Sequence, residues 1–300
     1  MPHPSSLAVV VSRTTSMAFT DREAALAGGY DLRFVDKYRA GRELDPVVFA
    51  HPGVVLEDGP ARVYSVDGMH RIFSAIEAGR TSIPCAIIVR RQDLRTLVPA
   101  AALARIDAAA ASTSWFHRYQ TIQEVGLVGM REQASRFPAV FDLSFLRGRT
   151  VADFGGNIGQ LALEAYFNGA YRVTSFEYQA EAVATGQLIA RTLGLSTVQH
   201  VQVDFNAGSF EEDVLRVLPA WDWAGFTAIY RTREIRDVRK LFDFVVEHAA
   251  VGIIFEGHAD PTVDTDEYIR AFLAPYNFAS IEYVGTHQLR RCYILRKRWV

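Results

Sequence analysis

The stretch Val151–Gln160, VADFGGNIGQ, decides the fold expected for this chain of 300 residues. Residues Thr150–Phe154 are apolar enough for a buried strand, and the run Gly159–Phe167 predicts a helix. Gly155 and Gly159 permit a tight turn between the two and a close approach of a ligand to the backbone. A strand, a glycine turn and a helix in this order indicate an open α/β sheet, which binds ligands beyond the carboxyl ends of its strands.

The same alternation continues to the end of the chain. A second helix is predicted at Ala180–Leu193, and the last two strands are separated by a short turn that favours an antiparallel hairpin at a sheet edge. Because parallel strands need crossover connections, the pattern predicts a parallel sheet with helices on both faces. The strands predicted after the first are 171–177, 198–204, 226–230, 252–256, 279–284 and 291–297.

The glycine turn does not fit a dinucleotide site. Counting G-x-G-x-x-G from Gly155 puts Asn157 and Gln160 where glycines are needed. The pattern Asp153-x-Gly155-x-Asn157-x-Gly159 instead resembles the first motif of class I S-adenosylmethionine-dependent methyltransferases, over roughly residues 115 to 298. The resemblance implies an α/β fold with a Rossmann-like seven-stranded sheet and S-adenosyl-L-methionine as cofactor. The residues it assigns to the methionine portion are Asp153, Gly155, Gly156, Asn157 and Gly159.

Two further acids follow the next strands. Glu177 lies 24 residues after Asp153 and can accept hydrogen bonds from both ribose hydroxyls of an adenosine. The resemblance implies that Asp204 contacts the adenine amino group and that Phe205 packs on the ring. The alternatives are a helix-capping aspartate at 153, a solvated glutamate at 177 and a turn aspartate at 204.

Aromatic residues precede the sheet. Trp115, His117 and Tyr119 stand where related enzymes cover the cofactor, and an aromatic face attracts a sulfonium through a cation–π interaction. Tyr119 is therefore a candidate cofactor contact. The alternative is a helix that uses these residues for packing.

The methyl acceptor is expected beside the segments that follow the fourth and fifth strands, Ile229–Glu234 and Phe255–His258. His258 is the candidate general base, with Glu256 orienting it or contacting substrate, because imidazole titrates near neutral pH. Arg231, with Arg233, is a candidate for binding an anionic substrate group. Loop hydrogen bonding and solvated charges are the alternatives.

Three parts are predicted along the chain: a small α+β domain over residues 1–96, a helical linker over 97–114 and a methyltransferase domain over 115–300. Residues 63–89 resemble the nucleotide-binding core of the ParB and sulfiredoxin superfamily. In this comparison Asp67 ends a strand, and His70 and Arg71 open a helix whose amides can meet a phosphate. Met69 stands where sulfiredoxins carry cysteine, which argues against sulfinic-acid reduction. A helix cap with solvated side chains is the alternative.

Composition names no macromolecular partner. Lys plus Arg total 32 against 34 Asp plus Glu, so no overall field favours nucleic acid or a membrane surface. Cys85 and Cys292 fit neither a disulfide framework nor a metal site, and no signal peptide or membrane span is expected. We therefore expect a cytoplasmic protein with reduced thiols. The basic cluster at residues 290–298 fits a protected edge strand, with phosphate contact as the alternative.

The sequence thus predicts a methyltransferase of small-molecule biosynthesis, acting on an oxygen or nitrogen of a small molecule such as a nucleotide-containing or phosphorylated metabolite. Its N-terminal module is expected to bind a nucleotide or phosphorylated ligand. Two other hypotheses stay open: a nucleotide-binding kinase or switch module that governs a fused methyltransferase, and an RNA-modifying methyltransferase.

Overall fold

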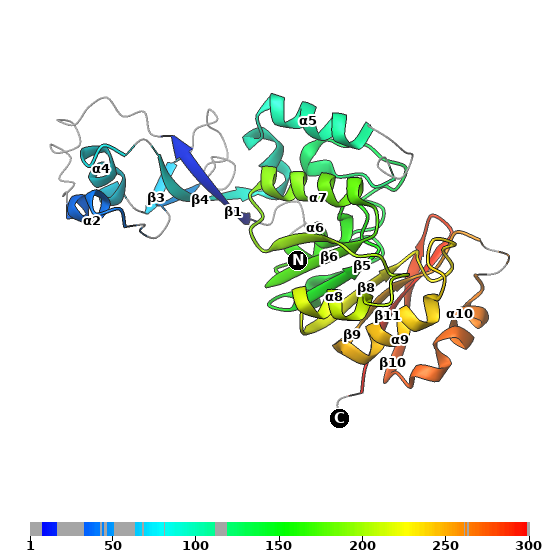
Figure 1. Ribbon diagram of the computed structural model, residues 1–300. Coiled ribbons are helices and arrows are strands. Elements are labelled where there is room, and N and C mark those ends of the chain that lie inside the picture. The colour runs from blue at the N-terminus through cyan, green and yellow to red at the C-terminus, as the bar shows by residue number, and fades with distance from the viewer. Residues whose placement is uncertain are drawn as a thin grey trace. The chain divides into compact units, whose positions relative to one another are not determined.

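A computed structural model describes most of the chain from residue 8 to residue 298 (Figure 1). The chain divides into two compact units: the first contains Met1–Val98, and the second contains most of the residues from Pro99 onward. Helix α5, Ala100–Ala111, forms within the predicted linker. The described residues are 8–16, 33–42, 44, 47–50, 64–67, 69–80, 82–111, 119–260, 262 and 264–298.

The first unit contains a four-stranded sheet with the order β1-β4-β2-β3. β4 pairs in parallel with β2, whereas the pairs β1 with β4 and β2 with β3 are antiparallel. The strand expected to end at Asp67 is present, and the expected helix begins at Met69 and contains His70 and Arg71. The elements are β1 (Ala8–Ser16), α2 (Val35–Arg39), β2 (Val47–Ala50), β3 (Tyr64–Asp67), α4 (Met69–Glu77), β4 (Ser82–Arg90) and the 3-10 helix η2 (Arg91–Leu97).

The second unit is built on a seven-stranded sheet with the order β10-β11-β9-β8-β5-β6-β7. If these strands are numbered 1 to 7 along the chain, the order is 3-2-1-4-5-7-6, and strand 7 is antiparallel to strand 5. This is the Rossmann-like fold of class I methyltransferases, as the sequence predicts. The strands are β5 (Thr150–Phe154), β6 (Arg172–Glu177), β7 (Val198–Gln202), β8 (Trp221–Thr227), β9 (Ala249–Glu256), β10 (Ser280–His287) and β11 (Arg290–Arg296).

Two expectations about strands need correction. The fourth strand covers Trp221–Thr227 rather than 226–230, because Gly225 lies within the strand where Asp153 and Leu161 leave no room for a side chain. Residues 228–230 do not continue the strand, because the chain turns at Ala228, which has a φ of 61°. The basic strand β11 is not an edge strand, since it pairs with both β10 and β9. Edge protection therefore does not explain its arginines.

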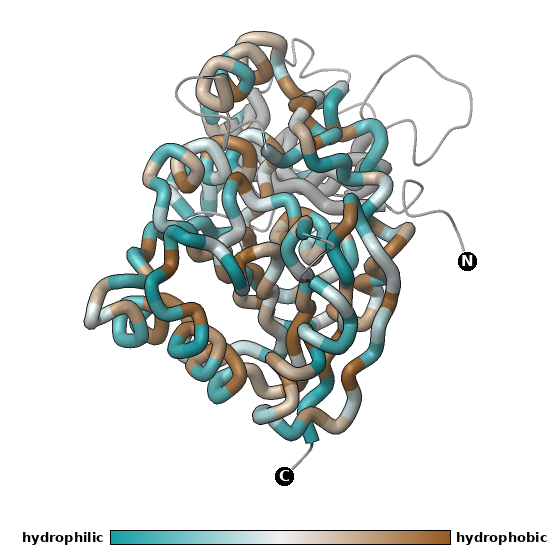
Figure 2. Tube along the Cα trace, turned by 90° about the vertical axis from the view of Figure 1, so that its right-hand side faces the viewer, coloured by the Kyte–Doolittle hydropathy of each residue, from teal (hydrophilic) through white to brown (hydrophobic). Residues whose placement is uncertain are grey.

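Helices cover both faces of this sheet (Figure 1). Helices α6 and α7 both approach His200 of β7, which places them on one face, and α8, α9 and α10 share an aromatic-rich core with the other face. Hydrophobic and hydrophilic residues alternate along the helical turns of the tube in Figure 2. The helices are α6 (Gln160–Phe167), α7 (Ala180–Leu193), α8 (Phe210–Val217), α9 (Val238–His248) and α10 (Asp266–Leu273), with short 3-10 helices η3 (Gln123–Val125), η4 (Ser144–Leu146) and η5 (Ala274–Tyr276).

The core next to α8 and α9 is stabilised by burial of large aromatic rings. Phe154, Phe226, Phe242 and Phe255 are fully buried, and the rings of Phe226 and Phe242 lie 4.8 Å apart in an edge-to-face arrangement. Each buried ring contributes roughly 2 kcal/mol through the apolar area it removes from water. This packing fixes the positions of the carboxyl ends of strands β5, β8 and β9. None of the described helices has the length and apolarity needed to cross a membrane.

The segment before β5 docks on α6 through buried polar side chains. The Gln160 side-chain amide donates to the carbonyls of Thr121 and Arg131, and its oxygen accepts from Arg136 Nη1 at 2.9 Å. Gln133 donates to Glu164 Oε1 at 2.7 Å. Because these buried polar groups form hydrogen bonds with one another instead of with water, they fix the position of the segment before β5 on helix α6.

Candidate active site

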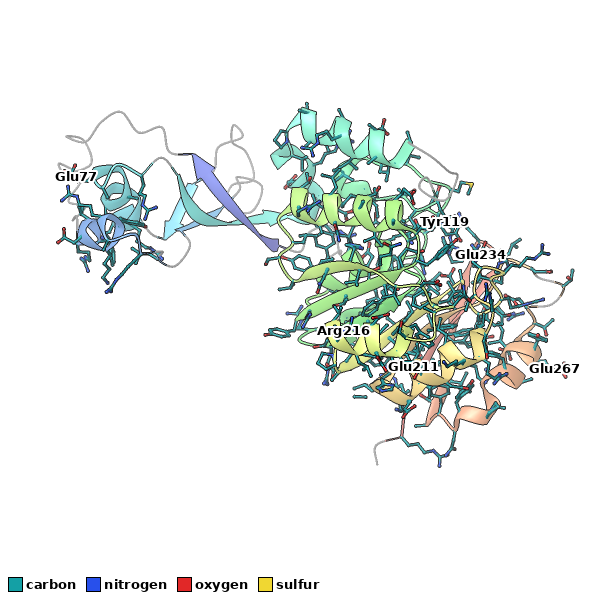
Figure 3. The ribbon with its side chains drawn as sticks, viewed as in Figure 1. Glu77, Tyr119, Glu211, Arg216, Glu234 and Glu267 are labelled. Atoms are coloured by element: carbon teal, nitrogen blue, oxygen red, sulfur yellow. The ribbon has the colours of Figure 1, made fainter. Side chains whose placement is uncertain are left out.

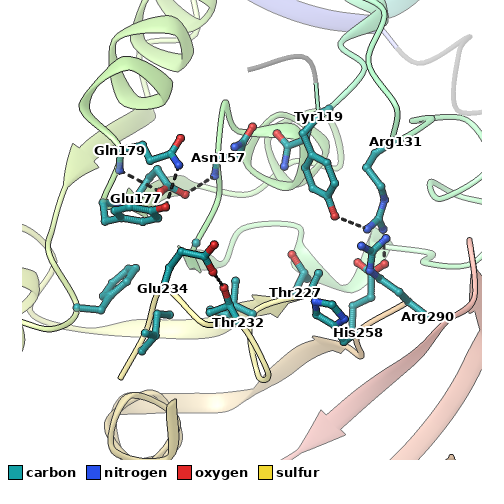
Figure 4. A pocket seen from close by; sticks show the side chains of 18 of the residues that line it. Tyr119, Arg131, Asn157, Glu177, Gln179, Thr227, Thr232, Glu234, His258 and Arg290 are labelled. Carbon is teal, nitrogen blue, oxygen red and sulfur yellow. Dashed lines mark hydrogen bonds and ion pairs between the residues drawn. The ribbon is translucent and has the colours of Figure 1, made fainter. Parts of the chain in front are cut away.

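A cavity of about 430 Å³ lies at the carboxyl ends of the central strands (Figure 4). This volume is in the range of small-molecule sites. Figure 3 shows two of its lining residues, Tyr119 and Glu234, at the same edge of the sheet. Of the residues predicted from sequence, the cavity is lined by Tyr119, Gly155, Asn157, Glu177, Phe205, Glu256 and His258.

Glu177, the last residue of β6, is held by backbone amides. Its Oε1 accepts from the amides of Tyr178 at 2.8 Å and Gln179 at 3.1 Å, and its Oε2 accepts from the Asn157 amide at 3.0 Å. Burial raises the pKa of this carboxyl, and the amide hydrogen bonds oppose the shift. Since each carboxylate oxygen can accept two hydrogen bonds, Oε2 retains capacity for a ligand hydroxyl.

The amides of the glycine turn are already used within the protein. Gly155 and Gly156 donate to the Phe176 carbonyl, and Gly159 donates to the Gly156 carbonyl. The Gln160 amide donates to Gln120 Oε1 at 3.0 Å. The start of α6 therefore does not present these amides to a ligand carboxylate.

Gln120 is a site residue that the sequence analysis missed. Its side chain bridges the glycine turn, because Nε2 donates to the Gly156 carbonyl at 3.1 Å while Oε1 accepts from the Gln160 amide. It also lines the cavity and is buried. A glutamine in a loop 36 residues before the turn carries no local signal of this contact.

The turn glycines are required by neighbouring side chains. A Cβ at Gly155, where φ is +70°, would lie 2.7 Å from Ile229 Cγ2, and one at Gly159, where φ is +96°, would lie 2.1 Å from His200 Cε1. These contacts are shorter than real Cβ contacts, and a positive φ disfavours other residues as well. Packing alone thus accounts for both glycines, whether or not a ligand lies against them.

Asp153 lies beneath the turn rather than among the cavity-lining residues. It is fully buried, and neither carboxylate oxygen has a hydrogen-bond partner among the described residues. A Cβ at Gly156 would lie 2.6 Å from its Oδ2, which shows how closely the turn covers it. Burial raises the pKa of Asp153 to about 7, although the charge of Arg136 opposes the shift. Its cofactor contact stays a prediction.

The two predicted adenine contacts differ in position. Phe205 is buried and lines the cavity, whereas Asp204 is exposed and outside the lining. Asp204 Oδ1 accepts from the Asn206 amide at 2.9 Å, as the turn alternative predicts. That hydrogen bond leaves the other carboxylate oxygen available, so an adenine contact stays a prediction.

Glu256, the last residue of β9, is bound by arginines rather than by His258. Its oxygens pair with Arg131 and, at 2.5 Å, with Arg136 Nη2. Burial favours the protonated carboxyl, but the charges of Arg136 and Arg131 outweigh it and lower the pKa of Glu256 to about 2. A carboxylate this acidic is a poor proton acceptor at neutral pH. The structure thus gives Glu256 a charge-pairing position and not the expected orientation of His258.

His287 completes this cluster in one tautomer. Its Nδ1 lies 2.8 Å from Arg131 Nη2, which can only donate, so Nδ1 accepts and Nε2 carries the proton. The Nε2 proton is then directed at Ser135 Oγ, 3.2 Å away. Burial lowers the pKa of His287, in agreement with a neutral ring.

His258 lines the cavity beside Arg290. Burial, followed by the charge of Arg290, lowers the pKa of His258, so the imidazole is neutral at physiological pH and can accept a proton. Arg231 does not line the cavity: its Nη1 lies 3.8 Å from Asp264 Oδ1, and its guanidinium stands 5.5 Å from the ring of Tyr268. Its role as a substrate ligand stays a prediction.

Tyr119 lies between two arginines. Its hydroxyl accepts from Arg131 Nη1 at 2.9 Å, and the Arg131 and Arg290 guanidiniums stand 5.5 and 5.9 Å from its ring. The predicted aromatic neighbours Trp115 and His117 lie outside the described residues. The ring and hydroxyl of Tyr119 therefore contact Arg131 and Arg290 of the protein itself.

The predicted phosphate site of the first unit is only partly described. Asp67 is the last residue of β3, and His70 and Arg71 lie in the first turn of α4, in the expected order. The resemblance to the ParB and sulfiredoxin superfamily, and nucleotide binding there, stay predictions. Titration with nucleoside triphosphates would test them.

Solved structures resemble this chain at low identity. The N-terminal domain of EvdMO1 with SAH bound is 12% identical, with 65% of this chain and 95% of that chain covered and a TM-score of 0.48. Magnesium protoporphyrin IX methyltransferase (ChlM) from Synechocystis PCC 6803 with bound SAH is 16% identical, with 55% and 83% covered and a TM-score of 0.43. Against the longer EvdMO1 structure the chain spans 46% of the length, at 14% identity and a TM-score of 0.48. No protein-family model and no curated protein matches the sequence.

Proposed function

We propose that this chain is an S-adenosylmethionine-dependent methyltransferase that acts on an oxygen or nitrogen of a small molecule. The observation that carries the proposal is Glu177, a buried carboxylate that lines the cavity at the end of β6 and is oriented by three backbone amides. In this sheet order that position suits the ribose hydroxyls of an adenosyl ligand.

The cavity fits the remaining parts of such a ligand. Phe205 offers an apolar surface for the adenine, and Asn157 Oδ1 is a buried acceptor without a partner among the described residues. Asn157 is held in a left-handed conformation, φ 54°, between the two turn glycines. Together Glu177, Phe205 and Asn157 would hold the cofactor, which supplies an electrophilic methyl group when it is bound.

His258 is proposed to accept the proton that the acceptor loses. It lies at the part of the cavity formed after β8 and β9, and its lowered pKa keeps the ring neutral and ready for a proton. The protein otherwise has to orient the acceptor and exclude water, since methyl transfer needs few obligatory groups.

Calorimetric titration with S-adenosylhomocysteine, the product form of the cofactor, tests the proposal. The wild-type protein should bind it, and Glu177→Ala should weaken binding about 10- to 100-fold, because a hydrogen bond to a charged group is worth about 1.5 to 3 kcal/mol. Glu282→Ala removes an exposed carboxylate from β10 and should leave the affinity unchanged. Absence of binding by the folded wild-type protein would refute the assignment.

A further inference from the structure

The charged groups of the cavity follow the order of the strands. Glu177 ends β6, and Arg290 begins β11, with β5, β8 and β9 between them. Adjacent strands lie about 4.8 Å apart, so four spacings separate the two strands by about 19 Å. Figure 4 shows the same order, with Glu177 and Gln179 at one end of the cavity and Arg131 and Arg290 at the other.

This separation decides which ligand can reach the arginines. In the proposed cofactor about six single bonds of roughly 1.5 Å join the ribose ring to the amino-acid carboxylate, a reach of at most about 9 Å. The hydrogen bond to Glu177 and the ribose ring add about 5 Å, so the extended ligand reaches at most about 14 Å from Glu177, short of the roughly 19 Å to β11. The arginine end of the cavity, beside β9 and β11, is left for the acceptor.

The arginine end has more positive than negative charge. Arg131, Arg136 and Arg290 line the cavity there, and Glu256 is the carboxylate that pairs with the first two. Three guanidiniums against one carboxylate leave a surplus of two positive charges. Both nearby histidines, 258 and 287, have lowered pKa values and add no charge at neutral pH.

Arg290 is the guanidinium available to a ligand. Within the described part of the chain no carboxylate lies within 4 Å of it, and its buried Nε has no hydrogen-bond partner there. The nearby Asp264 is engaged by the Tyr230 hydroxyl and by Arg231. A partly buried cation in this state gains most from a bound anion, because the low dielectric strengthens the attraction.

Arg290 also faces the candidate base. The Gly257 amide donates to the Arg291 carbonyl just beyond the last β9–β11 pair, His258 and Arg290 both line the cavity there, and the charge of Arg290 contributes to the lowered pKa of His258. An acceptor held by Arg290 would therefore have its reacting group beside the imidazole.

Apolar surface adjoins the arginine end. Met130 lines the cavity and is 57% exposed. The Gln288 side chain donates to the Met130 carbonyl at 3.0 Å, which holds the β10–β11 turn against that segment. The mouth thus offers hydrophobic contact beside a cation.

We infer that the methyl acceptor is an organic anion whose carboxylate or phosphate binds at Arg290, beside Arg131, with its apolar body against Met130. The inference rests on the proposed function for the orientation of the cofactor, but the anion site rests on the arginines themselves. A neutral acceptor would leave the surplus charge uncompensated.

The test uses benzoate and phenyl phosphate as probes, with benzamide as the neutral counterpart. Binding is followed by NMR titration of the full chain, once saturated with S-adenosylhomocysteine and once without it. The two anions should bind and benzamide should bind at least tenfold more weakly. Arg290→Gln should weaken anion binding at least tenfold. The control, Arg291→Gln, removes the same charge one residue along the strand, where side chains point to the opposite face, and should leave it unchanged.

The cofactor is measured in parallel to separate the two possible sources of the anion. Arg290→Gln should leave the affinities for S-adenosylhomocysteine and for 5′-methylthioadenosine, which lacks the amino acid, within about twofold. Selective loss of S-adenosylhomocysteine would mean that Arg290 holds the cofactor carboxylate and would overturn the inference. Equal binding of benzoate and benzamide would also overturn it. If the wild-type protein binds neither adenosyl compound, the proposed function fails while the anion titration without cofactor still reports on Arg290.

Discussion

Glu177 and Glu256 occupy equivalent places at the two ends of one cavity but have opposite properties. Each is the last residue of a parallel strand and each is buried. Backbone amides surround Glu177 and burial raises its pKa, whereas two arginines neutralise Glu256 and lower its pKa to about 2 despite its burial. The strand end places the carboxylate, and partners from distant parts of the chain decide its role: a ligand acceptor at one end and an ion pair at the other.

The largest expected effect is on stability at the arginine end. Glu256→Gln should lower the free energy of unfolding by about 3 to 5 kcal/mol, because it leaves Arg131 and Arg136 buried without their anion. Glu177→Gln, the matched change at the other end, should cost less, about 1 to 3 kcal/mol, because it strands no charge but replaces one amide-accepting oxygen by an NH2 group that faces a backbone N–H donor. Urea denaturation at pH 7 measures both, and equal losses would remove the distinction between the two ends.

Acid should reduce the stability that Glu256 contributes through its pairing with the arginines. The folded-state pKa of Glu256 lies below its ordinary value of 4.5, so its contribution to stability is present above about pH 4.5 and is lost as the pH falls toward 2. The difference in unfolding free energy between wild type and Glu256→Gln should therefore narrow from pH 5 to pH 2.5. A gap that stays constant over this range would contradict the arginine pairing.

The Glu177 end should respond to pH through ligand affinity. Its raised pKa means that the carboxyl begins to protonate above pH 4.5 as the pH falls, and the protonated form accepts ribose hydrogen bonds less well. Wild-type affinity for S-adenosylhomocysteine should thus decline on acidification. In Glu177→Gln the affinity should be lower and flat with pH, and a decline equal to that of wild type would assign the titration to another group.

The smallest effect concerns the support of the glycine turn. Gln120→Ala removes two hydrogen bonds to the turn and should weaken binding of S-adenosylhomocysteine about fivefold, equivalent to about 1 kcal/mol. Gln199→Ala, an exposed position on β7, is the control and should not change the affinity. An unchanged affinity in Gln120→Ala would mean that the turn keeps its shape without this bridge.

The sequence predicts the features that depend on local patterns. Strand β5, the glycine turn, helix α7 and the position of Glu177 all follow from periodicity and spacing along a short stretch of chain. The fourth strand differs from its predicted range of 226–230, because Gly225, a residue type that usually weakens strands, lies inside it and makes room for Asp153 and Leu161. A glycine that is needed for packing cannot be distinguished from a turn glycine without its neighbours.

The arginine end could not be predicted in the same way. Arg131 and Arg136 reach Glu256 across 125 and 120 residues of sequence, from a segment without a recognisable motif. Arg290 belongs to a basic cluster that the sequence favoured as edge protection, and only the strand order shows that β11 is internal and that this arginine lines the cavity. Long-range pairing of charges leaves no periodic signal.

A crystal structure of the protein with S-adenosylhomocysteine tests the central claim most directly. We predict that the ribose hydroxyls lie within about 3.2 Å of the Glu177 carboxylate, with the amino-acid portion near Asn157 and Arg290 free of the ligand. A ligand bound in the reverse direction, with its carboxylate on Arg290 and its adenosine away from Glu177, would contradict the account.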